Sequence, residues 1–373
     1  MILTQEQIDY CMECGVCTGS CPISRVMGSF SPRQMIKRTL MDRDETVVMG
    51  RELWSCLTCA RCSTRCPAAI DFPEFARAHR EKARKEGNLP QFAHHGTLQA
   101  IATLQTRNIK QQRTDWAVDV GKFASTGDIF FFVGCAPFFE AVLKPGEGSV
   151  EVPRSVLRLL NRMGIEPVIS NDERCCGHDA LWSGDEATFR KLMEVNLEVI
   201  RASGAKKVLF SCPEGYTTFK VHAPKFFGEL PFEVLHVTEF LARELPGAGF
   251  VFKPYNGNGS GCITYQDPCR LGRQAGIFES PRELMALIPG IPFVEMGRNR
   301  ENSLCCGTTA WMECSSCSKA LQVDRLQEAK DAGANTVVTA CPKCRIHLTC
   351  AQQNTDLCLN IVDITTFLLK HLE

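Results

Sequence analysis

The sequence predicts a mixed α/β protein in which a helical N-terminal domain precedes a duplicated α/β domain built from parallel βαβ units. Three observations lead to this fold class. Two similar cysteine runs fall within the first 70 residues, a set of cysteine motifs occurs twice after residue 128, and helix-like segments alternate there with short β-branched segments. Such alternation favours parallel βαβ units, and a repeat at long spacing indicates a duplicated unit.

Composition limits the function classes. The chain has 373 residues, with 42 Lys and Arg against 42 Asp and Glu, so it lacks the basic footprint of a nucleic-acid-binding protein. No apolar run is long enough to cross a bilayer directly. The first ten residues lack the basic and apolar segments of a secretory signal. We therefore expect a cytoplasmic protein, with any membrane association made through a partner.

The 22 cysteines are the unusual feature. A disulfide framework is typical of short secreted chains, whereas this chain is long and gathers its cysteines in C-x-x-C motifs. Cysteines so close in sequence suit metal ligation in a reducing compartment.

Two cysteine runs in the N-terminal domain predict a pair of cubane [4Fe–4S] clusters. The runs are Cys11, Cys14, Cys17, Cys21 and Cys56, Cys59, Cys62, Cys66. A proline follows each run, which gives the spacing of two-cluster bacterial ferredoxins, where the fourth cysteine of a run binds the other cluster. We accordingly group Cys11, Cys14, Cys17 with Cys66, and Cys56, Cys59, Cys62 with Cys21. A pair of zinc sites is the alternative, but zinc favours two separated pairs of ligands per site.

The segments around these runs predict helices. Ser31 is a candidate N-cap, with Pro32 at the first helical position, and the stretch 72–86 has a helix-forming composition. This favours a helical ferredoxin domain over residues 1–90. Residues 91–127 contain no cysteine and are interpreted as a linker with some helix.

The rest of the chain contains two copies of one pattern, which we assign to residues 128–245 and 246–373. The first copy has Cys135, Cys175, Cys176 and Cys212, and the second has Cys269, Cys305, Cys306, Cys341 and Cys344. Cys135, Cys212 and Cys341 come just after predicted strands, at the sheet edge where sites form in open α/β sheets. Gly177 and Gly307 end the two Cys-Cys-Gly motifs, and we expect them to let the backbone turn so that adjacent thiolates face one site.

These motifs carry a family resemblance. The second copy reads C-x35-C-C-G-x33-C-x-x-C, which resembles the CCG domain of the B-type subunit of heterodisulfide reductase, and the N-terminal module is similar to its C-type partner. The whole chain resembles the fused D-type subunit, and also the iron–sulfur subunits of benzoyl-CoA reductase and of glycolate or lactate oxidoreductase complexes. The resemblance implies a noncubane [4Fe–4S] cluster held by Cys269, Cys305, Cys306, Cys341 and Cys344.

The first copy departs from this pattern at its fifth position. Gly215 stands where the second copy has Cys344, and glycine offers no side-chain ligand. Its four cysteines could still hold a further iron–sulfur cluster or zinc. His178, directly after the first Cys-Cys-Gly, is interpreted as a polar loop residue beside the site, with a proton donor or substitute ligand as the alternative. Cysteines without a repeat counterpart, such as Cys314, Cys317 and Cys350, are expected to be buried packing residues.

The linear order of motifs predicts an iron–sulfur electron-transfer subunit of a heterodisulfide-reductase-like complex, passing electrons between two cubane clusters and a CCG-domain cluster. One alternative is a catalytic subunit that cleaves a disulfide at the noncubane cluster, and another is an iron–sulfur subunit of a hydroxyacid oxidoreductase. The sequence shows no dinucleotide, flavin or haem signature, so we expect a flavoprotein or other redox subunits as partners. No catalytic residue is assigned.

Overall fold

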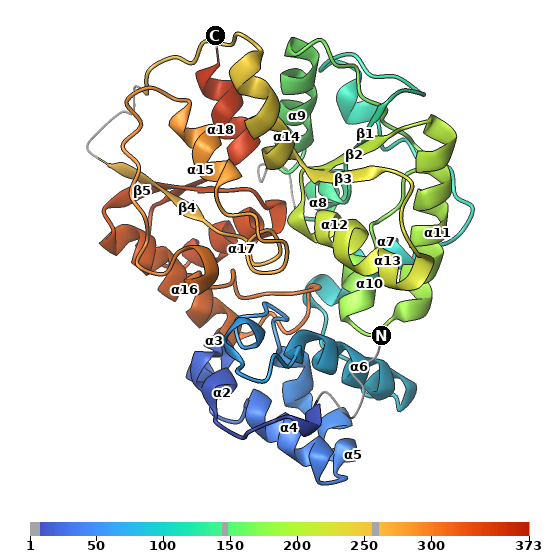
Figure 1. The fold of residues 1–373 in the computed structure, drawn as a ribbon, viewed down its shortest axis with the longest axis vertical. Helices are drawn as coiled ribbons and strands as arrows, with labels where there is room; N and C mark the ends of the chain where they lie inside the picture. The colour runs from blue at the N-terminus through green and yellow to red at the C-terminus, as the bar shows by residue number, and fades with distance from the viewer. Residues whose placement is uncertain (1–7, 144–147, 256–260, 373) are drawn as a thin grey trace.

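The computed structural model describes residues 8–143, 148–255 and 261–372. A helical N-terminal domain, blue in Figure 1, lies below two α/β units that stand side by side. The first unit contains a three-stranded sheet of order β1-β2-β3, and the second contains one of order β4-β5-β6. The predicted fold class, a helical ferredoxin region followed by a duplicated parallel α/β unit, is thereby confirmed.

The N-terminal domain is built from short helices around the cysteine runs. They are α2 (Val16–Ser20), α3 (Pro22–Val26), α4 (Pro32–Leu40), α5 (Asp44–Val48) and α6 (Phe72–Lys85), with 3-10 turns at Arg51–Ser55 and Ser63–Arg65. The predicted cap of α4 is present, because Ser31 Oγ accepts a hydrogen bond from the Gln34 amide at 3.2 Å. Met35 and Ile36 on this helix are buried in the domain core.

The connecting segment 91–127 holds 3-10 turns at Ala93–Gly96 and Asp115–Ala117 and the helix α7 (Thr97–Leu104). It packs against both α/β units. The Ala93 amide donates to the Trp311 carbonyl at 2.7 Å in the second unit, and Arg113 pairs with Glu173 at 2.7 Å in the first. These contacts hold the segment 91–127 against both α/β units.

The first α/β unit has a fully parallel sheet. Its strands are β1 (Ile129–Phe132), β2 (Lys207–Phe210) and β3 (Glu233–His236), and its helices are α8 (Ala136–Leu143), α9 (Glu151–Arg162), α10 (His178–Trp182), α11 (Glu186–Ser203), α12 (Pro213–Thr217), α13 (Ala223–Phe227) and α14 (Val237–Glu244), with a π-helical turn at Thr218–His222 and a 3-10 turn at Leu245–Gly247. Phe132, Phe210 and His236 lie in register at the carboxyl ends of the three strands. Cys135 and Cys212 therefore emerge at one sheet edge.

The second unit repeats this arrangement. Its strands are β4 (Cys262–Gln266), β5 (Ala334–Thr339) and β6 (Asn360–Asp363), and its helices are α15 (Ser280–Ala286), α16 (Ser316–Asp331), α17 (Pro342–Gln352) and α18 (Ile364–His371), with a 3-10 turn at Arg300–Asn302. Gln266, Thr339 and Asp363 align at the strand ends, so Cys269 and Cys341 again follow the carboxyl edge.

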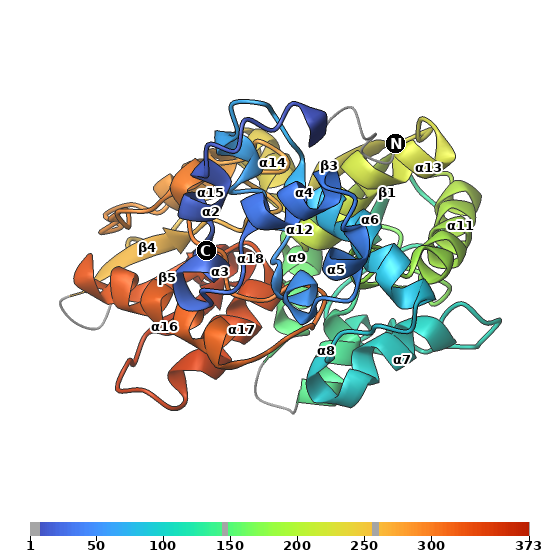
Figure 2. The ribbon, with the colours of Figure 1, turned by 90° about the horizontal axis from the view of Figure 1, so that it is seen from below.

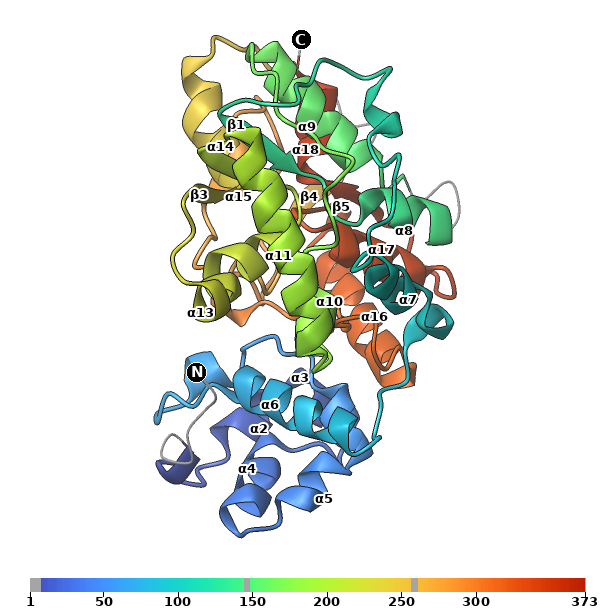
Figure 3. The ribbon, with the colours of Figure 1, turned by 90° about the vertical axis from the view of Figure 1, so that its right-hand side faces the viewer.

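The two units pack through equivalent helices. In Figure 1, α9 of the first unit lies beside α18 of the second, and α14 lies beside α15. Seen from below, the N-terminal helices lie across the junction of the units (Figure 2). From the side, α6 approaches α10, while α3 contacts α16 (Figure 3). Within the described ranges, no helix combines the length and apolarity needed to cross a bilayer.

Candidate iron–sulfur sites

The N-terminal cysteines gather into two sets. A pocket on the outer side of the domain is lined by Cys11, Cys14, Cys17 and Cys66, with Cys62 at its border; we name these first four the distal set. A second pocket is lined by Cys21, Cys56, Cys59 and Cys62, which we name the proximal set because its loop contacts the α/β units. The structure thus brings together the groups that the spacing suggested, with the fourth cysteine of each run crossing to the other group.

The backbone of both loops has the shape needed to wrap a cluster. Glu13 and Thr58 hold equivalent places before the second cysteine of each run, and each has φ of 47°. The residues just after that cysteine, Gly15 and Ala60, have φ of 80° and 62°. Non-glycine residues adopt this region rarely, and it persists only where the surroundings enforce it. A repeated strained loop in both runs therefore fits a bound cubane.

The thiol chemistry fits iron as well. Burial raises the pKa of Cys21 to about 12, and it raises the pKa of Cys62 well above the usual thiol value. Such buried sulfurs become thiolates only beside a cation. The iron ions of a cluster supply that positive charge to the thiolates bound to them, so the donor set and its burial are compatible with an iron–sulfur cluster.

The second α/β unit brings five thiols together so that each one contacts the next. They interact in the order Cys269, Cys305, Cys306, Cys344 and Cys341, and all except the half-buried Cys269 are buried. Gly307 has φ of 79°, and a Cβ there would lie 2.8 Å from the Ser318 carbonyl oxygen. Only glycine permits this turn, which places the neighbouring thiols on one site.

The first unit brings together four thiols and a gap. Cys135, Cys175, Cys176 and Cys212 line one pocket with Gly215, and the sulfurs of Cys135 and Cys175 are 3.7 Å apart. At Gly215, an added Cβ would lie 3.1 Å from Cδ1 of Phe210. In the second unit, the repeat places Thr339 at the position of Phe210 and Cys344 at that of Gly215. Where the first unit lacks the fifth thiol, the neighbouring side chain, Phe210, is larger than its counterpart Thr339 in the second unit.

The four sets form one series. The proximal loop contacts the second unit, because Arg273 Nε donates to the Cys59 carbonyl at 2.7 Å and Cys59 acts electrostatically on Cys305. The thiols of Cys341 and Cys212 interact across the junction of the two units. The order in space is therefore distal set, proximal set, second-unit set and first-unit set.

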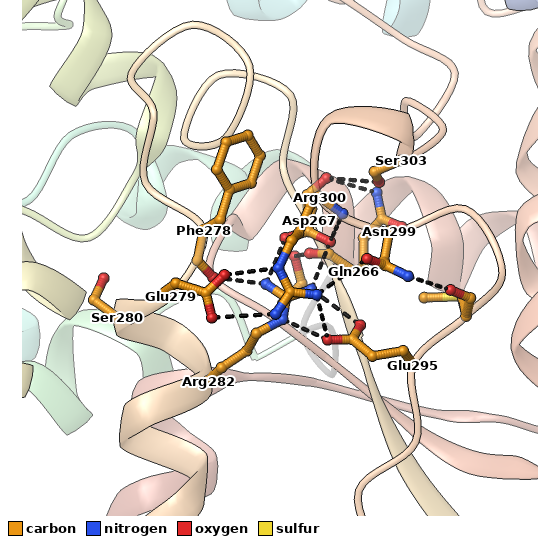
Figure 4. A network of polar contacts seen from close by, with 12 residues as sticks. Gln266, Asp267, Phe278, Glu279, Ser280, Arg282, Glu295, Asn299, Arg300 and Ser303 are labelled. Atoms are coloured by element: carbon orange, nitrogen blue, oxygen red, sulfur yellow. Dashed lines mark hydrogen bonds and ion pairs between the residues drawn. The ribbon is translucent and has the colours of Figure 1, made fainter.

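Each α/β unit braces its cysteine loops with a buried carboxylate. In the second unit, Asp267 lies two residues before Cys269 and pairs with Arg282 at 2.8 Å, as Figure 4 shows. The Arg300 amide also donates to Asp267 at 2.9 Å. In the first unit, Glu173 accepts hydrogen bonds from the Gly134 amide at 2.8 Å and from Arg113. Both networks tie the loop of the first cysteine to the loop of the cysteine pair.

A buried polar cluster stands in the wall of the first-unit pocket, and the sequence analysis missed it apart from His178. Lys343 pairs with Asp179 at 2.5 Å and with Glu214 at 2.6 Å, and His178 Nδ1 lies 2.8 Å from Asp179. Burial alone would lower the pKa of Lys343, but the two carboxylates raise it. The ammonium group thus already occupies the place a cation would take between these carboxylates. The signal was the repeat itself, in which Glu214 and Lys343 hold equivalent positions with opposite charge.

The unpaired cysteines correct one expectation. Cys314, Cys350 and Cys358 are exposed rather than buried, and Cys317 is half-buried. The prediction that such cysteines are packing residues was wrong for these positions. Helix α16 begins at Ser316, so Cys314 precedes it and does not share a helix face with Cys317.

Comparison with known proteins agrees with this architecture. A family model described as a 4Fe-4S dicluster domain matches residues 7–70, and one described as a cysteine-rich domain, CCG, matches 129–220 and 263–349. The first supports two cubane clusters in the N-terminal domain.

Three curated relatives extend the match. The D-type subunit of the dihydromethanophenazine:CoB–CoM heterodisulfide reductase of Methanosarcina barkeri is 30% identical, covering 92% of this chain and 88% of that protein. The B-type subunit of the fumarate reductase (CoM/CoB) of Methanothermobacter marburgensis is 27% identical over 91% of this chain and 67% of its own length. The EtfAB:quinone oxidoreductase of Syntrophomonas wolfei is 28% identical over 80% of this chain, which is 43% of that protein. The chain, which joins a 4Fe-4S dicluster domain to two CCG units, therefore belongs to the family of D-type heterodisulfide reductase subunits, which are iron–sulfur oxidoreductase proteins.

Proposed function

We propose that this chain is the electron-transferring subunit of a heterodisulfide-reductase-like complex. The distal and proximal sets would each hold a cubane, the five second-unit thiols a noncubane cluster, and the four first-unit thiols a further cluster or zinc. When bound, these groups supply one-electron carriers. A flavoprotein or another redox subunit is the expected partner, because the chain carries no signature for an organic redox cofactor.

The observation that carries this proposal is the uninterrupted series of four thiol sets. The distal set opens toward the surface, since Cys14 is exposed and Cys11 half-buried. The proximal and second-unit sets are linked by Arg273, and all their thiols are buried except the half-buried Cys269. The second-unit and first-unit sets meet at Cys341 and Cys212. Such an order suits transfer from a partner at the surface to the junction of the two units.

The chain's own residues hold the sites and keep the inner ones dry. Thr58 Oγ1 packs against Thr309 Oγ1 at 3.2 Å between the proximal loop and the second unit, and both threonines are buried. The Gly177 and Gly307 turns orient the paired thiols. These contacts fix the separation of neighbouring sites, on which the rate of electron transfer depends.

The test is electron paramagnetic resonance of the anaerobically purified protein, with and without an added thiol. Cluster signals that reduce and reoxidise without responding to thiol are the expected result. Absence of iron from the purified chain, or the absence of any redox-active signal, would overturn the proposal.

A second candidate is cleavage of a disulfide at the first-unit pocket. The observation that favours it is the buried cluster of Lys343, His178 and the two carboxylates beside four thiols. Cleavage of RS–SR′ takes up two electrons and two protons and gives RSH and R′SH, and polar groups in the pocket wall could bind and orient such a substrate. A paramagnetic signal that shifts or forms on addition of thiol would favour this candidate over the relay.

A further inference from the structure

Among the residues that the structure describes, three arginines between the N-terminal domain and the α/β units lack an acidic partner. Arg80 and Arg270 are 0% and 3% exposed, and Arg273 is half-buried. In the part of the chain that the structure describes, no carboxylate lies within 4.0 Å of these guanidinium groups; most other buried arginines, namely Arg77, Arg113 and Arg325, form ion pairs.

All three instead hold the backbone of the proximal loop. Arg80 donates to the carbonyls of Cys56 at 2.6 Å and Trp182 at 2.9 Å. Arg270 donates to the Thr58 carbonyl at 3.1 Å and to the Thr58 hydroxyl at 2.6 Å, and its guanidinium lies 4.4 Å from the centre of the Trp182 ring. Arg273 donates to the Cys59 carbonyl at 2.7 Å and to the Ser303 carbonyl at 2.5 Å.

The nearest compensating charges are cluster cysteines. The strongest favourable charge on Arg80 comes from Cys56, with Glu313 acting more weakly. The favourable charges on Arg273 come from Cys59, which belongs to the proximal set, and from Cys269 and Cys305, which belong to the second-unit set. Carbonyl and hydroxyl oxygens satisfy the hydrogen bonds of these guanidinium groups but do not neutralise their charge, so the arrangement favours negative charge at the proximal and second-unit sites. A cysteine-bound iron–sulfur cluster carries net negative charge and becomes more negative on reduction.

The distal set has a different environment. Arg33 lines its pocket, but this side chain is 32% exposed and pairs with Glu13 at 3.5 Å. Its charge is therefore neutralised and screened by solvent. Buried cations favour the reduced state of a neighbouring site more strongly than screened ones, because the local dielectric constant is low.

We propose that Arg80, Arg270 and Arg273 form a cationic bridge that raises the reduction potentials of the proximal and second-unit sites above that of the distal cubane. This proposal rests on the proposed function and adds the direction of electron flow, from the distal site inward. A reduced partner subunit donates one electron at the distal site, which is oxidised again as the proximal site takes up that electron. No proton or bond change is needed, and the bridge acts through charge without touching a substrate.

The experiment is a redox titration of the intact holoprotein, poised with dithionite and a dye mediator and followed by electron paramagnetic resonance. Cys14→Ala identifies the distal signal by its loss. In Arg273→Gln, the reduction potentials of the proximal and second-unit sites should fall relative to that of the distal site. The equilibrium for moving an electron from the distal site to these sites should become at least tenfold less favourable, which corresponds to about 59 mV for a one-electron couple. Arg273→Lys should restore most of the shift because it keeps the charge.

The matched control is Arg84→Gln, since Arg84 lies on the same helix as Arg80 but pairs with Asp185 at 3.3 Å. It should leave all potentials unchanged. Equal shifts at distal and proximal sites, no shift in Arg273→Gln, or equal effects of Lys and Gln would overturn the bridge. Arg80→Gln is a second test, and because Arg273 is less buried its variants remain informative if Arg80→Gln fails to fold. An iron-free parent chain would instead overturn the proposed function.

Discussion

The two α/β units use one scaffold for two different sites. Both have a parallel three-stranded sheet, a glycine with φ of 79° after the cysteine pair, and cysteines at the carboxyl edge of the sheet. Three of the equivalent pairs at which they differ are Phe210 and Thr339, Glu214 and Lys343, and Gly215 and Cys344. These pairs lie close together, so the two sites differ in thiol number and also in the volume and charge of the residues around the thiols.

The contrast teaches that, where one unit has no thiol at an equivalent position, neighbouring side chains take up the space and provide the polar contacts. The Phe210 ring occupies space against Gly215, and Thr339 is too small to do the same against Cys344. The Glu214 carboxylate meets the Lys343 ammonium across the junction at 2.6 Å. The first site is thus a remodelled pocket with its own packing and polar contacts.

The largest effect is expected from Cys344→Ala, which would make the second unit resemble the first. We expect loss of the second-unit cluster signal, with both cubane signals retained, because only that site loses a thiol. Iron analysis with electron paramagnetic resonance measures this. Cys350→Ala, at an exposed cysteine on the same helix α17, should change nothing. Loss confined to the cubane signals would contradict the site assignment.

Next in size is Lys343→Met, which removes the buried ion pairs of Lys343 with Asp179 and Glu214 between the units. It leaves the buried carboxylates of Asp179 and Glu214 without their cation, so we expect a loss of about 3–5 kcal/mol in unfolding free energy, measured by urea denaturation. Adding Asp179→Asn and Glu214→Gln should recover much of the loss, because the cluster is then neutral. An unchanged stability for the single variant would show that the ion pairs contribute little.

An intermediate effect comes from two equivalent helix caps. His236 caps α14, and burial lowers its pKa to about 3. Asp363 caps α18, and burial raises its pKa to about 6. The folded chain binds a proton at His236 less readily than the unfolded chain, so this residue makes stability rise with pH below the ordinary histidine pKa of 6.5. The folded chain binds a proton at Asp363 more readily, so stability falls as pH rises from 3.8 to about 6.

These two slopes oppose each other between about pH 4 and 6. As the pH rises from about 4 to 6, the stability of His236→Asn should therefore fall by about 2–3 kcal/mol relative to the parent. Over the same rise, the stability of Asp363→Asn should increase by a similar amount relative to the parent. Urea unfolding at several pH values measures both. Parallel pH profiles for the three proteins would be inconsistent with buried caps of opposite proton affinity.

The smallest effect sharpens the comparison in the reverse direction. Gly215→Cys alone should cost about 1–3 kcal/mol, because the new Cβ would lie 3.1 Å from Phe210. Combining it with Phe210→Thr should remove that overlap and allow a fifth thiol to reach the first site. We expect more iron and a spectrum closer to that of the second unit in the double variant only. An unchanged stability of Gly215→Cys would refute the steric explanation, and an unchanged iron content in the double variant would count against the repeat alignment.

Much of the fold could be predicted because it follows local patterns. The Ser31 cap and a helix over residues 72–86 were visible in the sequence, as were strands just before Cys212 and Cys341. The duplicated cysteine motifs indicated two equivalent units. The grouping of Cys66 with the first run also followed from spacing, and in the structure Cys66 lines the same pocket as Cys11, Cys14 and Cys17. Burial of single cysteines was predicted less well, because the position of Cys314 depends on where helix α16 begins.

The sequence by itself determined which cysteines are available, how they group and that Gly215 interrupts one set, because ligand spacing and repeats are local properties of the chain. Only the tertiary structure decided which sets lie next to one another and that Lys343 meets Asp179 and Glu214. It also decided that Arg80, Arg270 and Arg273 lie at the proximal loop without a carboxylate partner among the described residues. Those contacts join residues more than twenty positions apart, and they depend on how whole domains pack and exclude water. Charge and burial at such junctions are therefore properties of the assembled fold.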